Sequence, residues 1–347
     1  MTKTAVFKDD LFLEHMAGFS HIESAGRLLT LYDALATEEI GGHLVYPGFS
    51  GASHEVLCLN HSKKYVARVA QTAGKDQVNL DPDTQTSPRS YDAACLAAGA
   101  VVDCTRMVLA GDIDNGFCLV RPPGHHAEKD RAMGFCLFNN IAVAARYALH
   151  ELNLERILIV DWDLHHGNGT QHAFYDTDKV LYFSTHLFPF FPGSGAAYEV
   201  GTGAGEGCTV NIPLTGGQGD YAFATIFNEF LCPIAREYKP ELIMLSAGFD
   251  THRRDPFGGM SVTAKGFSYM TKVLLDLAQE LCQGRLVAAL EGGYDLIGLR
   301  EGTLAVLSEM AGHSQLHDKD VLELTTVSVP VPGLEEVRSI VNRYWKI

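Results

Sequence analysis

Short apolar runs alternate with longer amphipathic segments along most of this chain. The short runs are rich in β-branched residues and end in polar residues or glycine, which is typical of buried parallel strands. The longer segments repeat apolar residues at helical spacing, which favours helices that pack on a sheet. The pattern predicts strands at 116–121, 157–161, 180–186, 209–213, 241–247 and 285–290, and helices at 21–36, 54–72, 90–109, about 140–152, 220–238 and 263–282.

This alternation predicts an α/β fold with a doubly wound, mainly parallel sheet and helices on both faces. We expect a single domain, 1–347, because 46% of the residues are hydrophobic and no repeat or linker interrupts the chain. Folds of this class often reach such a length as one unit. The segments 41–53 and 80–88 are predicted to be loops or turns. The segment 187–207 is too long for a simple connection and is predicted to shape the rim of an active site.

Four of the predicted strands end in polar motifs: PPGHH at 122–126, DWDLHHGNG at 161–169, AGFD at 247–250 and EGGY at 291–294. In a doubly wound sheet such strand ends converge on one crevice. Side chains alternate along an extended strand, so Asp161, Asp163 and His165 project to the same side. Burying them unpaired would cost several kcal/mol, whereas a divalent metal would use their oxygens and nitrogen as ligands.

Each motif alone has a plainer explanation. The aspartates could cap a helix, adjacent histidines occur by chance on surfaces, and a tyrosine such as Tyr294 can be a rim aromatic. Four such motifs at the ends of four apolar strands are hard to assign to capping, and their convergence favours a metal-dependent site.

Composition limits the kinds of molecule that this chain is expected to bind. A formal net charge of −15 argues against non-specific nucleic-acid binding and would attract cationic substrates such as lysine-bearing peptides or polyamines. The eight cysteines are scattered and form no CxxC, which predicts reduced thiols and a cytoplasmic location. No signal peptide is visible and no apolar run approaches the length of a membrane span, so we expect no membrane partner. An oligomer is possible.

The order of the four motifs resembles the arginase-deacetylase fold family, specifically the zinc-dependent histone deacetylases, the acetylpolyamine amidohydrolases and the bacterial histone deacetylase-like amidohydrolases. The resemblance runs from the first predicted helix to about Gly312. The sequences of segments 121–128, 160–171 and 246–250 are similar to those of the class II branch. The class I branch carries an aspartate at the position of Asn168.

The resemblance implies one zinc ion per chain, with three protein ligands: Asp163, His165 and Asp250. Three ligands leave open positions for water and the substrate carbonyl, as a catalytic zinc site requires. The resemblance also implies His126, oriented by Asn168, as general base, and His125, oriented by Asp161, as an aid to charge balance and leaving-amine protonation. How the two histidines divide acid and base work stays open. Tyr294 is implied as the donor to the developing oxyanion.

Further residues are implied for substrate and monovalent cations. The substrate positions are Asp83, Gly134, Phe135, Phe191, Phe257 and Gly292. For Phe135 and Phe191, ordinary core packing is an equal alternative. One or two potassium ions are implied, at an inner site of Asp161, Asp163, His165, Ser184 and Thr185 and an outer site of Phe174, Thr177 and Val180.

Two departures from the family pattern matter. The early His-Pro-Glu motif appears as His21-Ile22-Glu23-Ser24, which leaves the conformation of the first loop open although Arg27 keeps its place. After Asp255-Pro256, relatives commonly have leucine and polyamine-selective members have glutamate, whereas this chain has Phe257. A phenylalanine supplies no anion for a second ammonium.

Three functions follow from these observations. The first is a zinc amidohydrolase that removes acetyl or other acyl groups from lysine side chains of a peptide or protein, and the second is the same chemistry on acetylpolyamines or another small acylated amine. The third is an inactive acyl-lysine binding module, which Tyr294 argues against because a binder needs no oxyanion donor. A dinuclear manganese site of ureohydrolase type is disfavoured, because only one set of metal ligands is evident.

Overall fold

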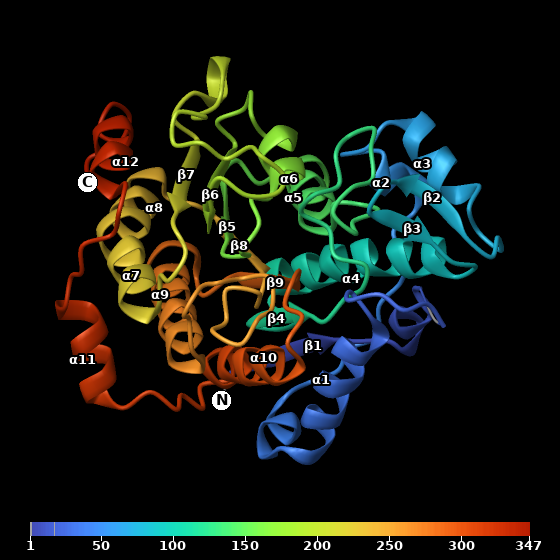
Figure 1. The fold of residues 1–347 in the computed structure, drawn as a ribbon, viewed down its shortest axis with the longest axis horizontal. Helices are drawn as coiled ribbons and strands as arrows, with labels where there is room; N and C mark the ends of the chain where they lie inside the picture. The colour runs from blue at the N-terminus through green and yellow to red at the C-terminus, as the bar shows by residue number, and fades with distance from the viewer. Residues whose placement is uncertain (1, 17) are drawn as a thin grey trace.

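The computed structural model describes residues 2–16 and 18–347. Seven parallel strands form a central sheet in the order β1-β4-β9-β8-β5-β6-β7 (Figure 1). They are β1 (Thr4–Phe7), β4 (Asn115–Cys118), β5 (Ile157–Asp161), β6 (Val180–Leu187), β7 (Thr209–Leu214), β8 (Leu242–Ala247) and β9 (Leu286–Leu290). A separate antiparallel hairpin joins β2 (Val78–Asp81) to β3 (Thr84–Thr86).

Helices surround this sheet. On one side α4 (Ser90–Ala110) packs on β4, β9 and α5 (Asn140–Glu151), and on the other α9 (Ala264–Cys282) and α10 (Leu296–Met310) pack on each other and against β8, β9 and β4 (Figure 1). The other α-helices are α1 (Ala25–Thr37), α2 (His54–Leu57), α3 (Lys63–Ala70), α6 (Asn168–Ala173), α7 (Asp220–Ile226), α8 (Cys232–Tyr238), α11 (Asp318–Thr326) and α12 (Leu334–Val341). The short 3-10 helices are Asp10–Glu14, Glu39–His43 and Gly203–Gly205, and a π-helical turn, Phe227–Leu231, links α7 to α8. The predicted α/β fold is confirmed.

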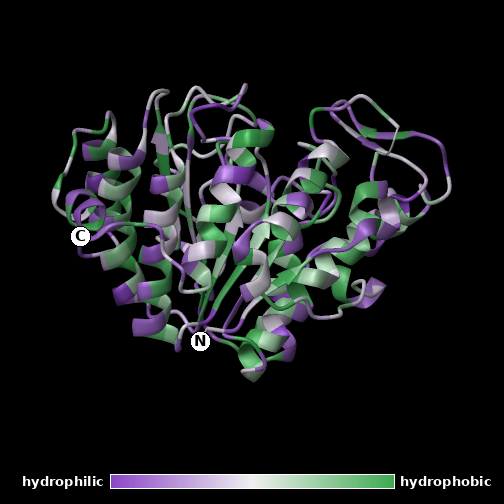
Figure 2. Ribbon diagram, turned by 90° about the horizontal axis from the view of Figure 1, so that it is seen from below, coloured by the Kyte–Doolittle hydropathy of each residue, from purple (hydrophilic) through white to green (hydrophobic). Residues whose placement is uncertain are grey.

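Burial explains the continuous apolar runs of the strands. Every residue of β5, β8 and β9 is buried, because helices cover both faces of the sheet there. Figure 2 shows hydrophobic colour concentrated in the central strands, whereas the outer helices mix hydrophobic and hydrophilic residues.

Two predicted helices have different bounds. The prediction of a single helix at 54–72 is wrong, because α2 and α3 are separate. Ser53 and Ser62 each cap a new helix, since the side chain of each accepts a hydrogen bond from a backbone N–H. Between them the buried His61 binds the carbonyl of Glu128. The helix expected at 21–36 begins only at Ala25, after an extended Ser24.

Several elements were not predicted or were misplaced. The turn-rich segment 80–88 contains part of the β2-β3 hairpin, and the strand expected at 116–121 ends at Cys118. The edge strand β1 is four residues long, too short to show an alternation. The helices α10, α11 and α12 were also absent from the prediction.

Among the residues that the structure describes, one helix has the length and composition to cross a membrane. It is α4, which has 21 residues and a strongly apolar composition. The expectation that no apolar run reaches this length was therefore wrong. In the structure 61% of its most apolar stretch is buried inside the protein, and the core helix of a globular protein passes the same test, so the signal is weak evidence for a membrane span.

Candidate active site

Four adjacent strands carry the four polar motifs. The strands β4, β9, β8 and β5 are neighbours in the sheet and run in the same direction, so their carboxyl ends meet at one edge. The last residue of β5, Asp161, lies level with Ser184 of β6 and Ser246 of β8. The convergence predicted from the strand ends is present.

Asp163, His165 and Asp250 form a cluster that could hold a metal ion. One possible ligand atom from each lies within 4.8 Å of the others. The Nδ1 atom of His165 lies 3.2 Å from a carboxylate oxygen of Asp163 and 2.9 Å from one of Asp250. Within the described part of the chain, no other group of three or more His, Cys, Asp or Glu residues has this geometry.

The electrostatics of the cluster also suit a cation. Both carboxylates are almost fully buried, and burial together with the charge of Asp163 raises the pKa of Asp250 to about 7. Two buried carboxylates and one imidazole fit a metal such as zinc, and three protein ligands leave coordination positions free for water and substrate. The residues present therefore fit the cofactor that the sequence implies.

The paired histidines lie beside this cluster, with ring centroids 4.0 Å apart. The Nδ1 atom of His125 is 3.0 Å from a carboxylate oxygen of Asp161, and Nδ1 of His126 is 2.8 Å from the side-chain oxygen of Asn168. These are the partners that the resemblance assigned to them. Tyr182 donates a second hydrogen bond to Asp161 and fixes its carboxylate.

The two imidazoles have different environments. Burial alone would lower the pKa of His125, but the charges of Asp161, Asp163 and Glu291 raise it to about 10. Burial, followed by the neighbouring His125 and His165, lowers the pKa of His126 well below its ordinary value. The first imidazole therefore favours its charged form and the second its neutral form.

Glu291 is a buried residue of the site that the sequence analysis did not single out. One of its carboxylate oxygens accepts hydrogen bonds from the backbone N–H groups of Gly124 and His125, and the other accepts from Ser246. It thus connects the loop that carries His125 and His126 to the carboxyl ends of β8 and β9. Burial raises its pKa to about 7. Its position directly after an apolar strand was the available signal.

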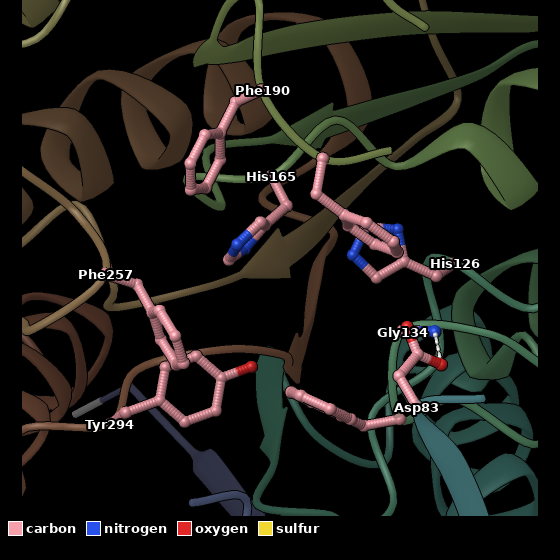
Figure 3. A pocket seen from close by; sticks show the side chains of 9 residues that line it. Asp83, His126, Gly134, His165, Phe190, Phe257 and Tyr294 are labelled. Carbon is pink, nitrogen blue, oxygen red and sulfur yellow. Dashed lines mark hydrogen bonds between the residues drawn. The ribbon is translucent and has the colours of Figure 1, made fainter. Parts of the chain in front are cut away.

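A cavity of about 190 Å³ opens above the cluster. Its lining residues are Asp83, His126, Gly134, Phe135, His165, Phe190, Phe191, Phe257 and Tyr294. Figure 3 shows His126, His165 and Tyr294 facing the cavity from different sides, with the Tyr294 hydroxyl directed toward its centre. Burial, and next the charge of Asp250, raises the pKa of Tyr294 well above its ordinary value, so the hydroxyl keeps its proton and can donate.

Aromatic side chains form most of the cavity wall. Phe191 meets the His126 ring edge-on at 5.1 Å, and Phe257 meets the Tyr294 ring at 5.2 Å. Phe190, which the sequence analysis missed, stacks on His165 at 5.5 Å. The aromatic content of the loop around it was the only signal, because a loop without periodicity does not tell which ring faces inward.

Two further predicted residues take different positions. Asp83 lies at the cavity, and one of its carboxylate oxygens accepts the backbone N–H of Gly134 at 3.0 Å (Figure 3). Gly292 is not among the lining residues and instead donates its N–H to Asp163. A Cβ atom at Gly292 would lie 2.5 Å from a carboxylate oxygen of Asp250, so glycine lets the backbone pass directly behind the cluster. Its role at the substrate surface stays a prediction.

The proposed potassium positions lie along β6 and before it. Ser184 pairs with Asp161 across the sheet, and the hydroxyl of Thr185 is buried without a hydrogen-bond partner among the described residues. Phe174, Thr177 and Val180 lie between the end of α6 and the start of β6. Potassium binding remains a prediction.

The first loop is organised by a buried ionic cluster. The carboxylate of Glu23 binds the guanidinium of Arg121 at 2.5 and 2.8 Å and that of Arg27 at 3.0 Å, and all three side chains are buried. Arg27 also donates to the carbonyls of Gly293 and Glu291. The altered His21–Ser24 sequence therefore still joins the first loop to the loop that bears Tyr294.

Replacing Glu23 by glutamine should lower the free energy of unfolding by about 3–5 kcal/mol, because two buried guanidinium groups lose their counter-charge. Burial opposes ionisation of Glu23, but Arg121 and Arg27 hold its pKa well below the usual range. The stabilisation is therefore present above the unfolded-state pKa and is lost as the pH falls through the folded-state value. Urea unfolding at neutral pH measures the effect. Glu280→Gln, which breaks an exposed pair with Arg236, is the control and should change little. A Glu23→Gln protein as stable as the wild type would show that the cluster is not stabilising.

An α/β protein with a buried cluster of two carboxylates and an imidazole, two histidines and a tyrosine around one cavity contains the groups that metal-assisted hydrolysis requires. Comparison with known proteins agrees with this class. The family model of the histone deacetylase domain matches residues 21–310. The chain belongs to the histone deacetylase family and is a hydrolase of the deacetylase type.

Individual relatives support this assignment. The chain is 36% identical to a probable deacetylase of Archaeoglobus fulgidus, over all of this chain and 99% of that protein. It is 39% identical to histone deacetylase 18 of Arabidopsis thaliana over 99% of this chain, but it spans only 52% of that longer protein. The crystal structure of the HDA15 HD domain superposes with a TM-score of 0.89 at 37% identity, covering 99% of this chain and 95% of that one.

Proposed function

We propose that this protein is a zinc-dependent amidohydrolase that removes acetyl or other acyl groups from lysine side chains of peptides or proteins. The observation that carries the proposal is the position of the Asp163, His165 and Asp250 cluster beneath a small, aromatic-walled cavity that His126 and Tyr294 also face. Such a cavity suits a long, thin side chain whose apolar stem lies against aromatic rings while its amide reaches the cluster.

The donor set supports zinc as the metal. When bound, a zinc ion would polarise the acyl carbonyl and lower the pKa of a coordinated water. The charge of a divalent cation would offset the burial of Asp163 and Asp250. Zinc content after purification in metal-free buffer, compared with the content after reconstitution, measures the stoichiometry, for which we expect one ion per chain.

Three side chains of the protein then transfer protons and stabilise the charge that develops during hydrolysis. His126 takes a proton from the attacking water on Nε2, since its Nδ1 is occupied by Asn168 at 2.8 Å. His125, held by Asp161, balances charge and assists protonation of the leaving lysine amine. The hydroxyl of Tyr294 donates a hydrogen bond to the oxygen that becomes negatively charged as the carbonyl is attacked.

Phe257 favours an acyl-lysine over an acetylpolyamine. It lies at the cavity, 40% exposed, where the distal ammonium of a polyamine would need a carboxylate to offset its desolvation. The overall negative charge attracts peptides and polyamines alike and selects neither. We expect kcat/KM for an acetyl-lysine peptide to exceed that for N-acetylputrescine, and Phe257→Glu to shift the ratio toward the polyamine.

The test is one comparison with a zinc-loaded preparation of the wild type and of Phe257→Glu, using acetyl-lysine peptides, longer acyl-lysine peptides and N-acetylputrescine. A wild type that prefers the polyamine would contradict the substrate assignment and make Asp83 the next acid to replace. Binding of acyl-lysine peptides with no hydrolysis of any substrate would instead indicate a binding module.

We further propose a cytoplasmic location. All eight cysteines are free thiols, which supports a reducing compartment.

A further inference from the structure

The side chain of Asn168 uses both ends of its amide. Its oxygen lies 2.8 Å from Nδ1 of His126, and its nitrogen donates to a carboxylate oxygen of Glu128 at 2.5 Å and to the carbonyl of His126 at 3.3 Å. Asn168 is 3% exposed, so water cannot replace these partners easily. The hydrogen bonds of this one amide therefore connect Glu128 to the histidine that faces the cavity (Figure 3).

The partners determine which way the amide points. A carboxylate and a backbone carbonyl only accept hydrogen bonds, so the atom of Asn168 that faces both of them must be the nitrogen. The atom that faces His126 is then the oxygen, which accepts a proton from Nδ1. His126 consequently carries its proton on Nδ1 and presents the lone pair of Nε2 to the cavity. If the amide were reversed, its nitrogen would donate to Nδ1 of His126, and the imidazole would carry its proton on Nε2 and could not act as a base.

An asparagine at position 168 needs a hydrogen-bond acceptor that fixes the orientation of its amide, whereas an aspartate there would not. A carboxylate at position 168 would accept from His126 in either orientation, whereas an amide has one productive and one unproductive orientation. The oxygen and nitrogen of the asparagine amide are nearly equal in size, so steric fit barely distinguishes its two orientations. A fixed acceptor on the far side of the amide supplies the preference.

Glu128 is held in place to act as that acceptor. Its backbone N–H donates to the carbonyl of Arg131 at 2.9 Å, and its own carbonyl accepts from the imidazole of His61 at 2.9 Å. The carboxylate oxygen that binds Asn168 also accepts from Nδ1 of His172, 2.8 Å away. Asn168 and His172 are four residues apart on α6 and lie on the same face, so one carboxylate reaches both.

We propose that Glu128 is a positioning residue that locks the amide of Asn168 and thereby keeps the proton of His126 on Nδ1. The proposal rests on the function proposed above, in which His126 is the general base. Glu128 touches neither substrate nor metal and acts only through Asn168. An aspartate at position 168 would place a negative charge directly beside His126. In this protein the negative charge is on the carboxylate of Glu128, and Asn168 lies between it and His126.

The first test measures the tautomer and the rate in Glu128→Ala. Nitrogen NMR of histidine-labelled, zinc-loaded protein distinguishes a protonated Nδ1 from a protonated Nε2, and the His126 signals are assigned by their loss in His126→Gln. We expect wild type to be protonated on Nδ1 and Glu128→Ala to show a population protonated on Nε2. We expect kcat for an acetyl-lysine peptide to fall about 10-fold to 100-fold, the range for loss of an orienting partner, with KM and zinc content unchanged.

The second test is a double substitution. Asn168→Asp alone should lower kcat, because it places two carboxylates at the 2.5 Å contact with Glu128. Asn168→Asp combined with Glu128→Ala should recover most of the kcat lost in Glu128→Ala, because aspartate needs no orientation lock. His172→Ala is the matched control: it removes the other partner of Glu128, leaves the Asn168 contact in place and should leave kcat unchanged.

Two results would overturn the proposal. One is a Glu128→Ala protein whose His126 stays protonated on Nδ1 and whose kcat is unchanged. The other is a double variant no faster than Glu128→Ala, which would assign Glu128 a purely structural role. A wild type that hydrolyses no acyl-lysine would contradict the proposed function instead, and the NMR comparison of wild type with Glu128→Ala would still decide whether the lock exists.

Discussion

Replacing Asp250 by alanine is expected to remove bound zinc and activity together. The proposed site has three protein ligands, and two are too few to hold the ion well. Asp250 also contributes one of the two carboxylates that face Nδ1 of His165, at 2.9 Å, so its loss leaves a single acid beside the imidazole. We expect metal analysis of the purified variant to find well under one zinc per chain and turnover of an acetyl-lysine peptide to fall to background.

The matched control for this variant is Asp276→Ala. Asp276 is an exposed aspartate that pairs with Lys272 on the surface of α9, and its loss should leave zinc content and turnover unchanged. If Asp250→Ala retained a full equivalent of zinc, Asp250 would not be a ligand and the cluster would need another member.

Replacing Tyr294 by phenylalanine should lower turnover by about 10²–10³, the usual cost of losing one oxyanion donor. The ring contacts would remain, since phenylalanine still packs against Phe257 and Phe135 and beneath the guanidinium of Arg27. No hydrogen bond among the described residues uses the Tyr294 hydroxyl, so its removal should not disturb the fold. We therefore expect kcat to fall while KM and zinc content stay close to the wild-type values.

Steady-state kinetics on an acetyl-lysine peptide, with zinc analysis of the same samples, checks this prediction. Tyr198→Phe is the control, because Tyr198 is 75% exposed and does not line the cavity. An unchanged kcat in Tyr294→Phe would mean that the developing negative charge is stabilised elsewhere.

Much of the fold was readable from local pattern. The strands β5, β6, β7, β8 and β9 were predicted to within one residue at every end, because a buried parallel strand needs a largely apolar run and such runs stand out in the sequence. The break between α2 and α3 was missed although its cap, Ser62, is a local feature; the contact of His61 with the carbonyl of Glu128 beside it joins positions 67 residues apart and could not be read from the sequence.

The composition of the site was likewise readable, and its arrangement was not. Polar residues at strand ends are local features, so Asp163, His165 and Asp250 could be chosen from the sequence as ligands. That the four strands bearing the motifs are adjacent follows from the order β4-β9-β8-β5, which is set by how the helices pack the strands together.

The sequence by itself therefore determined the class of fold, the family and the residues that can bind a metal, because each is expressed in a short segment of chain. Only the tertiary structure decided that Gly292 lies behind the cluster and that Phe190 lines the cavity. It alone joined Glu23 to Arg121, and Glu128 to Asn168. These contacts connect segments that periodicity and spacing treat separately, and burial of their polar groups is favourable only once the partner from the other segment is in place.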